Sequence, residues 1–429
     1  MFLNLRIFVK EIKKGVIMWK FLWIAIIAVL IESFLLGESL YGCTTAVVTA
    51  RASATGRPFL WKQRDTGTEW NHIAHFKGER YDFTGLANSE DTVTREVWTG
   101  VNSAGFAIMN NASYNMKPDS LMGLPELEGV VMMEALGRCA TVDEFEEYIR
   151  TLPEPRCLET NFGVIDAQGG AAYFEVWDYG YVKYDANDPE VAPDGYLIRT
   201  NFSFFGLEDE GMGYVRYQNA THLFEQAYAQ KKLSPEWIFE VPARSFYNAQ
   251  LETDLERGKG RLQSVWAVDQ DYIPRNSTAA SVVVEGVCGG ERTDAVTMWC
   301  LLGYPPCSYA VPVWVRAGER IPECLRAGAG KDRAPQNEMA VRMKRAVFPV
   351  TRDNGKRYMR FDRTQDAMQQ LERTEHFSFQ VGREVIRQIE ERGYDPAVID
   401  DCNRKLDVLF EEIDARMAQR QEQSTLWNE

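Results

Sequence analysis

The chain has 429 residues, of which 45% are hydrophobic and 26% are charged. This is the composition of a globular protein, and it excludes disorder along most of the length. The formal net charge is −14 at pH 7, which argues against a nucleic-acid partner because a polyanion would be repelled. The chain contains only 4 histidines, so zinc sites built from several imidazoles are not expected. We predict neither a metal nor a cofactor.

The first 42 residues are typical of a secretory leader. Lysines between residues 10 and 20 precede an apolar run over residues 21–36, which Glu32 interrupts. A basic region followed by an apolar stretch of about 7–15 residues describes a signal peptide, and the run is short for a spanning helix of about 20 residues. We therefore predict an exported protein, periplasmic or secreted. A retained membrane anchor is the alternative.

The junction at Gly42-Cys43 permits three kinds of processing. The residues Leu40-Tyr41-Gly42-Cys43 loosely resemble a lipoprotein box, in which the cysteine would be lipidated, but a small or branched residue is usual where Tyr41 stands. Ordinary signal peptidase prefers a small residue three positions before the cut, where Leu40 stands. The third alternative is that the chain cleaves itself.

Cys43 begins a pattern that suits an N-terminal nucleophile. Residues 43–50 are branched or small and predict a strand, residues 54–58 predict a turn, and residues 59–61 begin a second strand that ends at Asp65. A free N-terminal cysteine supplies a thiol that attacks and an α-amine that accepts its proton, so no histidine is needed. Asp65 would orient the resulting ammonium. A cysteine at a strand end and a hairpin aspartate without catalytic tasks are the alternative.

The sequence Gly42-Cys43-Thr44-Thr45-Ala46 resembles the processing site of isopenicillin-N acyltransferases. The wider resemblance is to the choloylglycine hydrolase and penicillin acyltransferase superfamily of N-terminal-nucleophile (Ntn) hydrolases. It implies an α+β fold over residues 43–325, built as a four-layer αββα sandwich, in which Cys43 is freed by cleavage after Gly42.

A second family motif ends the predicted hairpin, as Trp61-Lys62-Gln63-Arg64-Asp65. The family aspartate is kept as Asp65, but Gln63 replaces its asparagine. Lys62 stands where relatives carry Arg or Gln. The resemblance implies that Lys62 and Gln63 contribute to substrate binding, and the departures from the motif leave the substrate open.

Three further segments match the family in order. The strand-turn-strand element over residues 99–111 implies an oxyanion donor at Asn111, with Asn110 as the alternative register. The strand that ends in Thr200-Asn201 implies that Asn201 binds the amine of the nucleophile and the scissile carbonyl. The segment over residues 272–278 implies that Arg275 polarises the cysteine site. Each of the three residues also has an ordinary structural explanation, as a strand end, a turn or a surface charge.

Beyond this region, residues 326–429 predict a linker and a helical extension. A flexible connection over residues 327–335 precedes two helices. The first ends at Gly393, and the second opens at Asp395-Pro396 with an apolar stripe from Val398 to Met417. Such a stripe must be buried, either against the main domain or in a homo-oligomer formed through these helices.

Taken together, the residues and the resemblance imply an enzyme that cleaves a linear amide C–N bond of an N-acyl small molecule through a Cys43 thioester. Water would complete the reaction in a hydrolase, and an acceptor amine in an acyltransferase. The alternative is a lipoprotein of the same fold in which lipidated Cys43 is inactive and the protein binds ligands only. Export would also permit disulfides among the other cysteines of the 8 in the chain.

Overall fold

The structure is a computed structural model that describes residues 42–90, 95–116, 126–256, 265–269, 271–327, 333–353 and 355–423. The leader predicted over residues 1–42 lies outside these ranges except for Gly42. Within the described ranges, no helix combines the length and the apolar character that crossing a membrane requires.

Cys43 directly precedes the first sheet, because strand β1 of that sheet begins at the next residue. All of its strands are antiparallel, in the order β10-β1-β2-β14-β15-β16. The predicted hairpin is confirmed, with Thr44 opposite Gln63 and Val48 opposite Phe59. The strands are β1 (Thr44–Val48), β2 (Phe59–Asp65), β10 (Tyr196–Arg199), β14 (Thr278–Glu285), β15 (Thr297–Leu302) and β16 (Val311–Val313).

The second sheet is an antiparallel meander in which the strands follow chain order from β3 to β9. The predicted turn between β5 and β6 is confirmed: Gly105 has φ +85°, and Asn102 Oδ1 accepts from Ala104 N and Phe106 N. The strands are β3 (Asn71–Phe76), β4 (Phe83–Asn88), β5 (Thr99–Asn102), β6 (Ala107–Ala112), β7 (Glu159–Ile165), β8 (Ala171–Trp177) and β9 (Gly180–Asp185).

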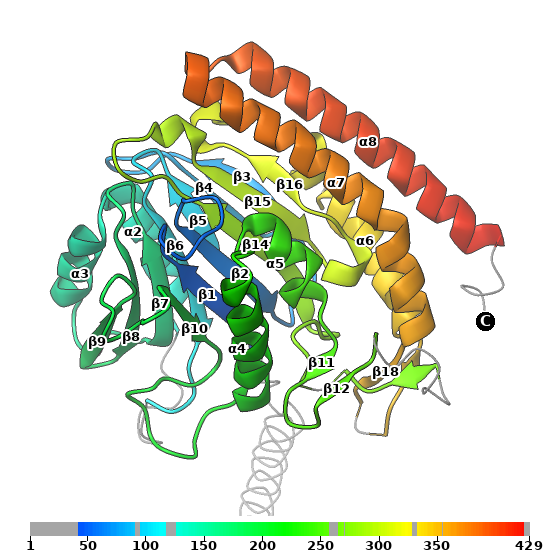
Figure 1. Cartoon of the computed structure of the whole chain (residues 1–429), viewed down its shortest axis with the longest axis horizontal. Coiled ribbons are helices and arrows are strands. Elements are labelled where there is room, and N and C mark those ends of the chain that lie inside the picture. Colours follow the sequence, from blue (N-terminus) through cyan, green and yellow to red (C-terminus); the bar gives the residue numbers. More distant parts are fainter. Residues whose placement is uncertain are drawn as a thin grey trace, which may run out of the picture. The chain divides into compact units, whose positions relative to one another are not determined.

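The two sheets face each other, because β1 contacts β7 and β8 while β2 contacts β6 and β7. Helices α2 (Glu128–Arg138) and α3 (Val142–Thr151) cover the outer face of the second sheet, where Phe145 packs edge-on against Phe162 and Phe174. Helices α4 (Tyr214–Ala229) and α5 (Pro235–Glu240) cover the first sheet. The predicted class, α+β with four αββα layers, is confirmed (Figure 1).

The C-terminal residues add helices to the side of the first sheet, and their number differs from the prediction. Instead of two helices, the described residues form α6 (Pro335–Val347), α7 (Phe361–Arg392) and α8 (Pro396–Gln423), with the small strands β17 (Val350–Thr351) and β18 (Arg357–Arg360) after α6. Pro349 follows α6 and cannot continue a helix. The predicted stop at Gly393, with φ +90°, is confirmed.

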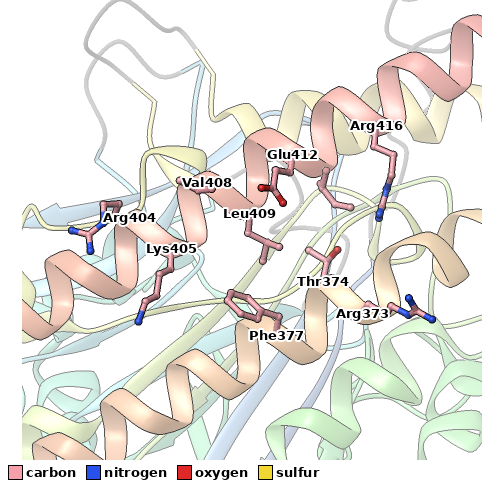
Figure 2. A pocket seen from close by; sticks show the side chains of 10 residues that line it. Arg373, Thr374, Phe377, Arg404, Lys405, Val408, Leu409, Glu412 and Arg416 are labelled. Atoms are coloured by element: carbon pink, nitrogen blue, oxygen red, sulfur yellow. The ribbon is translucent and has the colours of Figure 1, made fainter.

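The apolar stripe of α8 is buried within this chain. Ile399 and Leu406 are fully buried and Met417 is 3% exposed, and α8 packs against α7 and the short helix η6 (Glu323–Leu325). Between α7 and α8 lies a pocket of about 570 Å³ with Phe377 and Leu409 in its wall (Figure 2). None of its lining residues is one of the predicted site residues.

The extension is an integral part of the core, so truncating its buried side chains destabilises the whole protein. We expect Leu406→Ala to lower the free energy of unfolding by about 2–5 kcal/mol, because the lost methyl groups leave a cavity. Val408→Ala on the same helix is the control, since Val408 is 50% exposed, and it changes stability by less than about 0.5 kcal/mol. Urea unfolding compares the two variants. Equal effects would show that α8 does not share the core.

Candidate active site

Cys43 lies directly before β1, is 9% exposed and is still joined to Gly42. The backbone carbonyls on its two sides are each bound by an arginine. Arg275 Nη2 donates to Gly42 O at 2.6 Å, and Arg216 Nη1 donates to Cys43 O at 2.6 Å. The two consecutive peptide groups on either side of Cys43 are therefore each bound by a charged donor, Gly42–Cys43 by Arg275 and Cys43–Thr44 by Arg216.

Asp65, the last residue of β2, joins this group through Arg275. Its carboxylate, which is fully buried, accepts a hydrogen bond from Thr278 Oγ1 at the start of β14 and an ion pair from Arg275 Nη2. Burial disfavours the charged guanidinium, but the neighbouring Asp65 carboxylate outweighs this and raises the pKa of Arg275. Asp65 thus reaches the cysteine site by holding the arginine that binds the Gly42 carbonyl.

Asn201 is placed beside the same junction by the end of β10. Its Oδ1 accepts from Arg216 Nη2 at 2.7 Å, and its Nδ2 donates to Ala112 O at 2.7 Å. Because Ala112 ends β6, this side chain joins the ends of the two sheets. The amide is fully buried, and its hydrogen bonds fix which end is oxygen and which is nitrogen.

The two asparagines of β6 have different partners. Asn111 Oδ1 accepts from Thr45 Oγ1 at 2.7 Å, and its Nδ2 donates to Thr200 O, so it contacts β1 on one side and the residue before Asn201 on the other. Asn110 Oδ1 instead accepts from Lys62 Nζ at 2.6 Å. Asn111 is therefore the one connected directly to the strand of the nucleophile.

Lys62 and Gln63 lie on opposite faces of β2. Lys62 is 2% exposed, and its ammonium donates to Trp98 O at 2.7 Å and to Asn110 of the second sheet. Burial lowers the pKa of Lys62 to about 8, while the charge of a Cys43 thiolate opposes this shift. Gln63 faces the helical layer, where its Nε2 donates to Ala243 O at 3.1 Å. Lys62 thus bonds on the side of β2 that faces the second sheet, whereas Gln63 bonds to backbone on the other side of the strand.

The sequence did not indicate Arg216 and Thr278 as site residues. Arg216 lies in the first turn of α4, 173 residues from Cys43, and an arginine at a helix start has no motif of its own. Thr278 stands opposite Asp65 in the β2–β14 register. Its position beside a family aspartate follows from that pairing alone, which the sequence does not specify.

Any side chain at position 42 would clash with its neighbours, so the backbone conformation seen here requires glycine. A Cβ atom at this position would lie 2.4 Å from Asn201 Oδ1 and 2.6 Å from Arg216 Nη2. Both of these side chains are at most 1% exposed and are bonded to each other, so neither is free to move aside. The junction before Cys43 is thus shaped to glycine.

All eight cysteines lie within the described residues, and none of them forms a disulfide there. In the same ranges, no group of three or more His, Cys, Asp or Glu side chains is arranged to hold a metal ion.

No family model and no curated protein matches the sequence. Solved structures that resemble the chain include a mutant conjugated bile acid hydrolase from Clostridium perfringens, at 12% identity and a TM-score of 0.34, covering 64% of this chain and 92% of that chain. Penicillin V acylase from Agrobacterium tumefaciens is 15% identical with a TM-score of 0.35, covering 64% and 86% of the two chains. Penicillin G acylase from Alcaligenes faecalis is 11% identical with a TM-score of 0.31, covering 89% and 80%.

The first two of these proteins are of the kind that the sequence motifs resemble. Their identities and TM-scores are low, so the roles of individual residues are taken from the contacts described above.

The buried ammonium of Lys62 makes stability depend on pH in a defined window. Below pH 8 both the folded and the unfolded chain bind its proton, and between about 8 and 10.5 only the unfolded chain does. The contribution of Lys62 to the free energy of unfolding therefore rises with pH across that window, by about 3 kcal/mol in total. We expect the unfolding free energy of the wild type to rise by this amount relative to Lys62→Met, measured by urea unfolding from pH 7.5 to 10.5.

Lys77→Met is the matched control, since the Lys77 side chain is 81% exposed. Its stability should follow the wild-type curve throughout. Parallel curves for the wild type and Lys62→Met would contradict the buried-ammonium interpretation.

Proposed function

We propose that this protein is an exported N-terminal-cysteine enzyme that cleaves its own Gly42–Cys43 bond and then acts on a linear amide of an N-acyl small molecule. The observation that carries the proposal is the junction itself. Arg275 binds the Gly42 carbonyl oxygen, where negative charge would develop if Cys43 attacked that carbonyl. A charged donor at such an oxygen is the arrangement by which enzymes stabilise tetrahedral intermediates.

Self-cleavage would proceed through an acyl shift. The Cys43 Sγ forms a bond to the Gly42 carbonyl carbon, the C–N bond breaks, and the thiol proton ends on the departing Cys43 nitrogen. Water then adds to the thioester, giving Gly42 a carboxyl group and returning a proton to Sγ. The products are a leader that ends at Gly42 and a chain that begins with a free Cys43 amine.

Turnover would use the same atoms with a substrate in place of Gly42. The α-amine accepts the thiol proton, the thiolate attacks the acyl carbon, and the amine delivers the proton to the leaving nitrogen. An amide nitrogen carries two N–H donors. Each of Asn111 and Asn201 uses one on a backbone carbonyl, which leaves one for the oxyanion. Water or an acceptor amine then resolves the thioester.

Lys62 supports this chemistry as a nearby cation. Its ammonium would attract the negative charge of the thiolate that attacks the substrate. It would also attract a carboxylate on the substrate, in keeping with its predicted role in substrate binding.

An apolar acyl group suits the surface that follows Asn201. Phe204, Phe205 and Leu207 are 51%, 55% and 53% exposed. Their segment is tied down by Asn115, whose Nδ2 donates to Ser203 O and Leu207 O. We infer that this anchored loop supplies apolar contacts to the acyl group. Conjugated bile acids, the acyl side chains of β-lactams, N-acyl amino acids and acyl-homoserine lactones form the panel to test.

The alternative, a lipoprotein with lipidated Cys43, predicts a different mature N-terminus. A lipidated and blocked cysteine has no free amine to act as base. A protein anchored by an uncleaved leader would instead retain residues 18–42. Each of the three alternatives therefore predicts a different mass for the mature protein.

We expect intact-mass and peptide analysis of the exported protein to show a chain that starts with unmodified Cys43. Cys43→Ala should retain the leader, because the attacking sulfur is gone, and should be inactive against the whole N-acyl panel. Leader loss in Cys43→Ala would show that a separate peptidase acts, and a diacylglyceryl adduct on the wild type would refute the enzyme.

The second test uses the steric limit at the junction. Gly42→Ala places a methyl group against Asn201 and Arg216, so we expect self-cleavage to slow at least tenfold while the folded protein still accumulates as precursor. Gly37→Ala is the same change farther up the leader and should leave cleavage unchanged. Electrophoresis of pulse-labelled protein follows both. Wild-type cleavage of Gly42→Ala would contradict a junction bound in the site.

A further inference from the structure

Arg216 is a buried cation that lacks a carboxylate partner among the described residues. Its three hydrogen bonds go to neutral acceptors: Cys43 O at 2.6 Å, Thr44 Oγ1 at 3.0 Å and Asn201 Oδ1 at 2.7 Å. The side chain is 1% exposed. Two other buried arginines differ in this respect, since Arg199 is paired with Glu175 and Arg244 with Glu375.

The backbone around Arg216 leaves space for its guanidinium on two sides. A Cβ atom on Gly213 would lie 2.4 Å from Arg216 Nη2, and one on Gly42 would lie 2.6 Å from the same atom. Gly213 also has φ +87° directly before α4, a conformation in which glycine is favoured. The start of α4 and the junction before β1 are therefore both shaped to this side chain.

A buried charge without an opposite charge is costly, so its retention calls for a function. Burial, followed by the neighbouring Arg275, lowers the pKa of Arg216, while Asp65 and a Cys43 thiolate oppose that shift. The Asp65 carboxylate already pairs with Arg275. The other two anions that act on Arg216, the Asp271 carboxylate and a Cys43 thiolate, form no ion pair with another cation among the described residues, and of these two residues only Cys43 also accepts a hydrogen bond from Arg216.

We propose that Arg216 is the positioning residue of the nucleophile. It holds the Cys43 carbonyl and the side-chain amide of Asn201 in one arrangement both before and after the leader is removed, and it supplies positive charge beside Cys43. The contacts to Cys43 and Thr44 do not involve the leader, so they persist when Gly42 leaves. This inference rests on the proposed function of Cys43 and adds a residue that its mechanism does not otherwise need.

Two substitutions distinguish the effect of the hydrogen-bond geometry of Arg216 from the effect of its positive charge. Arg216→Lys keeps a cation but loses the fork that bonds Cys43 O and Asn201 Oδ1 together, and Arg216→Met removes both. The full-length protein is treated with iodoacetamide, and peptide mass spectrometry measures the alkylation rate of each cysteine. The fraction of chain that begins at Cys43 is measured in the same samples.

We expect Arg216→Met to lower the alkylation rate of Cys43 at least tenfold and to leave most of the chain uncleaved. Arg216→Lys should cleave at least tenfold more slowly than the wild type, yet keep the alkylation rate of Cys43 within about threefold, because the charge remains. The cysteines report on the fold within the same molecule: partly exposed Cys288 should react at its wild-type rate, and fully buried Cys300 should stay protected.

Arg244→Lys is the matched control, a buried arginine whose partners do not include Cys43 or its neighbours. It should lower thermal stability without changing Cys43 cleavage or alkylation. If both Arg216 variants react and cleave like the wild type, Arg216 has no positioning role. A gain of Cys300 labelling that accompanies each loss at Cys43 would likewise assign Arg216 to general stability and overturn the proposal. If wild-type Cys43 itself is neither freed nor reactive, the proposed function fails, independently of Arg216.

Discussion

The start of β1 depends on two guanidinium groups that bind consecutive backbone carbonyls, partly buried Arg275 at Gly42 and fully buried Arg216 at Cys43. Carbonyl oxygens are ordinary acceptors, but charge-assisted bonds to them in a dry environment hold position far more firmly than bonds to water. The two arginines are balanced differently. Arg275 has Asp65 as its counter-ion, while Arg216 donates its hydrogen bonds to neutral acceptors only.

The sandwich of two sheets is what brings these groups to one place. Cys43 and Asp65 come from neighbouring strands of the first sheet, Asn111 from the second, and Asn201 from the end of β10, where its amide reaches Ala112 across the gap. Thr45 completes the connection, because its hydroxyl donates to Asn111 and accepts from Tyr173 OH on β8. Thr45, Asn111 and Asn201 thus find hydrogen-bond partners in the interior. Arg275 Nε and Gln63 Oε1 are buried without a partner among the described residues.

The C-terminal helices support the sheet that carries the nucleophile rather than the site itself. Trp299 of β15 packs against Phe379 of α7, and Arg383 of α7 pairs with the buried Glu285 of β14. Since β14 is hydrogen-bonded to β2 along its whole length, the position of Asp65 is supported from behind by α7. The pocket between these helices is lined by residues of α7 and α8 alone (Figure 2).

The sequence by itself determined the local elements and the residue types of the site. Strand and turn patterns around Cys43, Asn102 and Gly393 were sufficient, because branched side chains, glycine at positive φ and helix stops act over a few residues. The prediction of two C-terminal helices missed the break between α6 and α7, although Pro349 marks it in the sequence because proline cannot continue a helix. The sequence assigned Gln63 and Lys62 together, although strand alternation turns them to opposite faces. The place of Arg216 at the site depends on tertiary structure alone. Its guanidinium reaches the Cys43 carbonyl only when α4 packs against β1, and no local rule relates residues that far apart in the sequence.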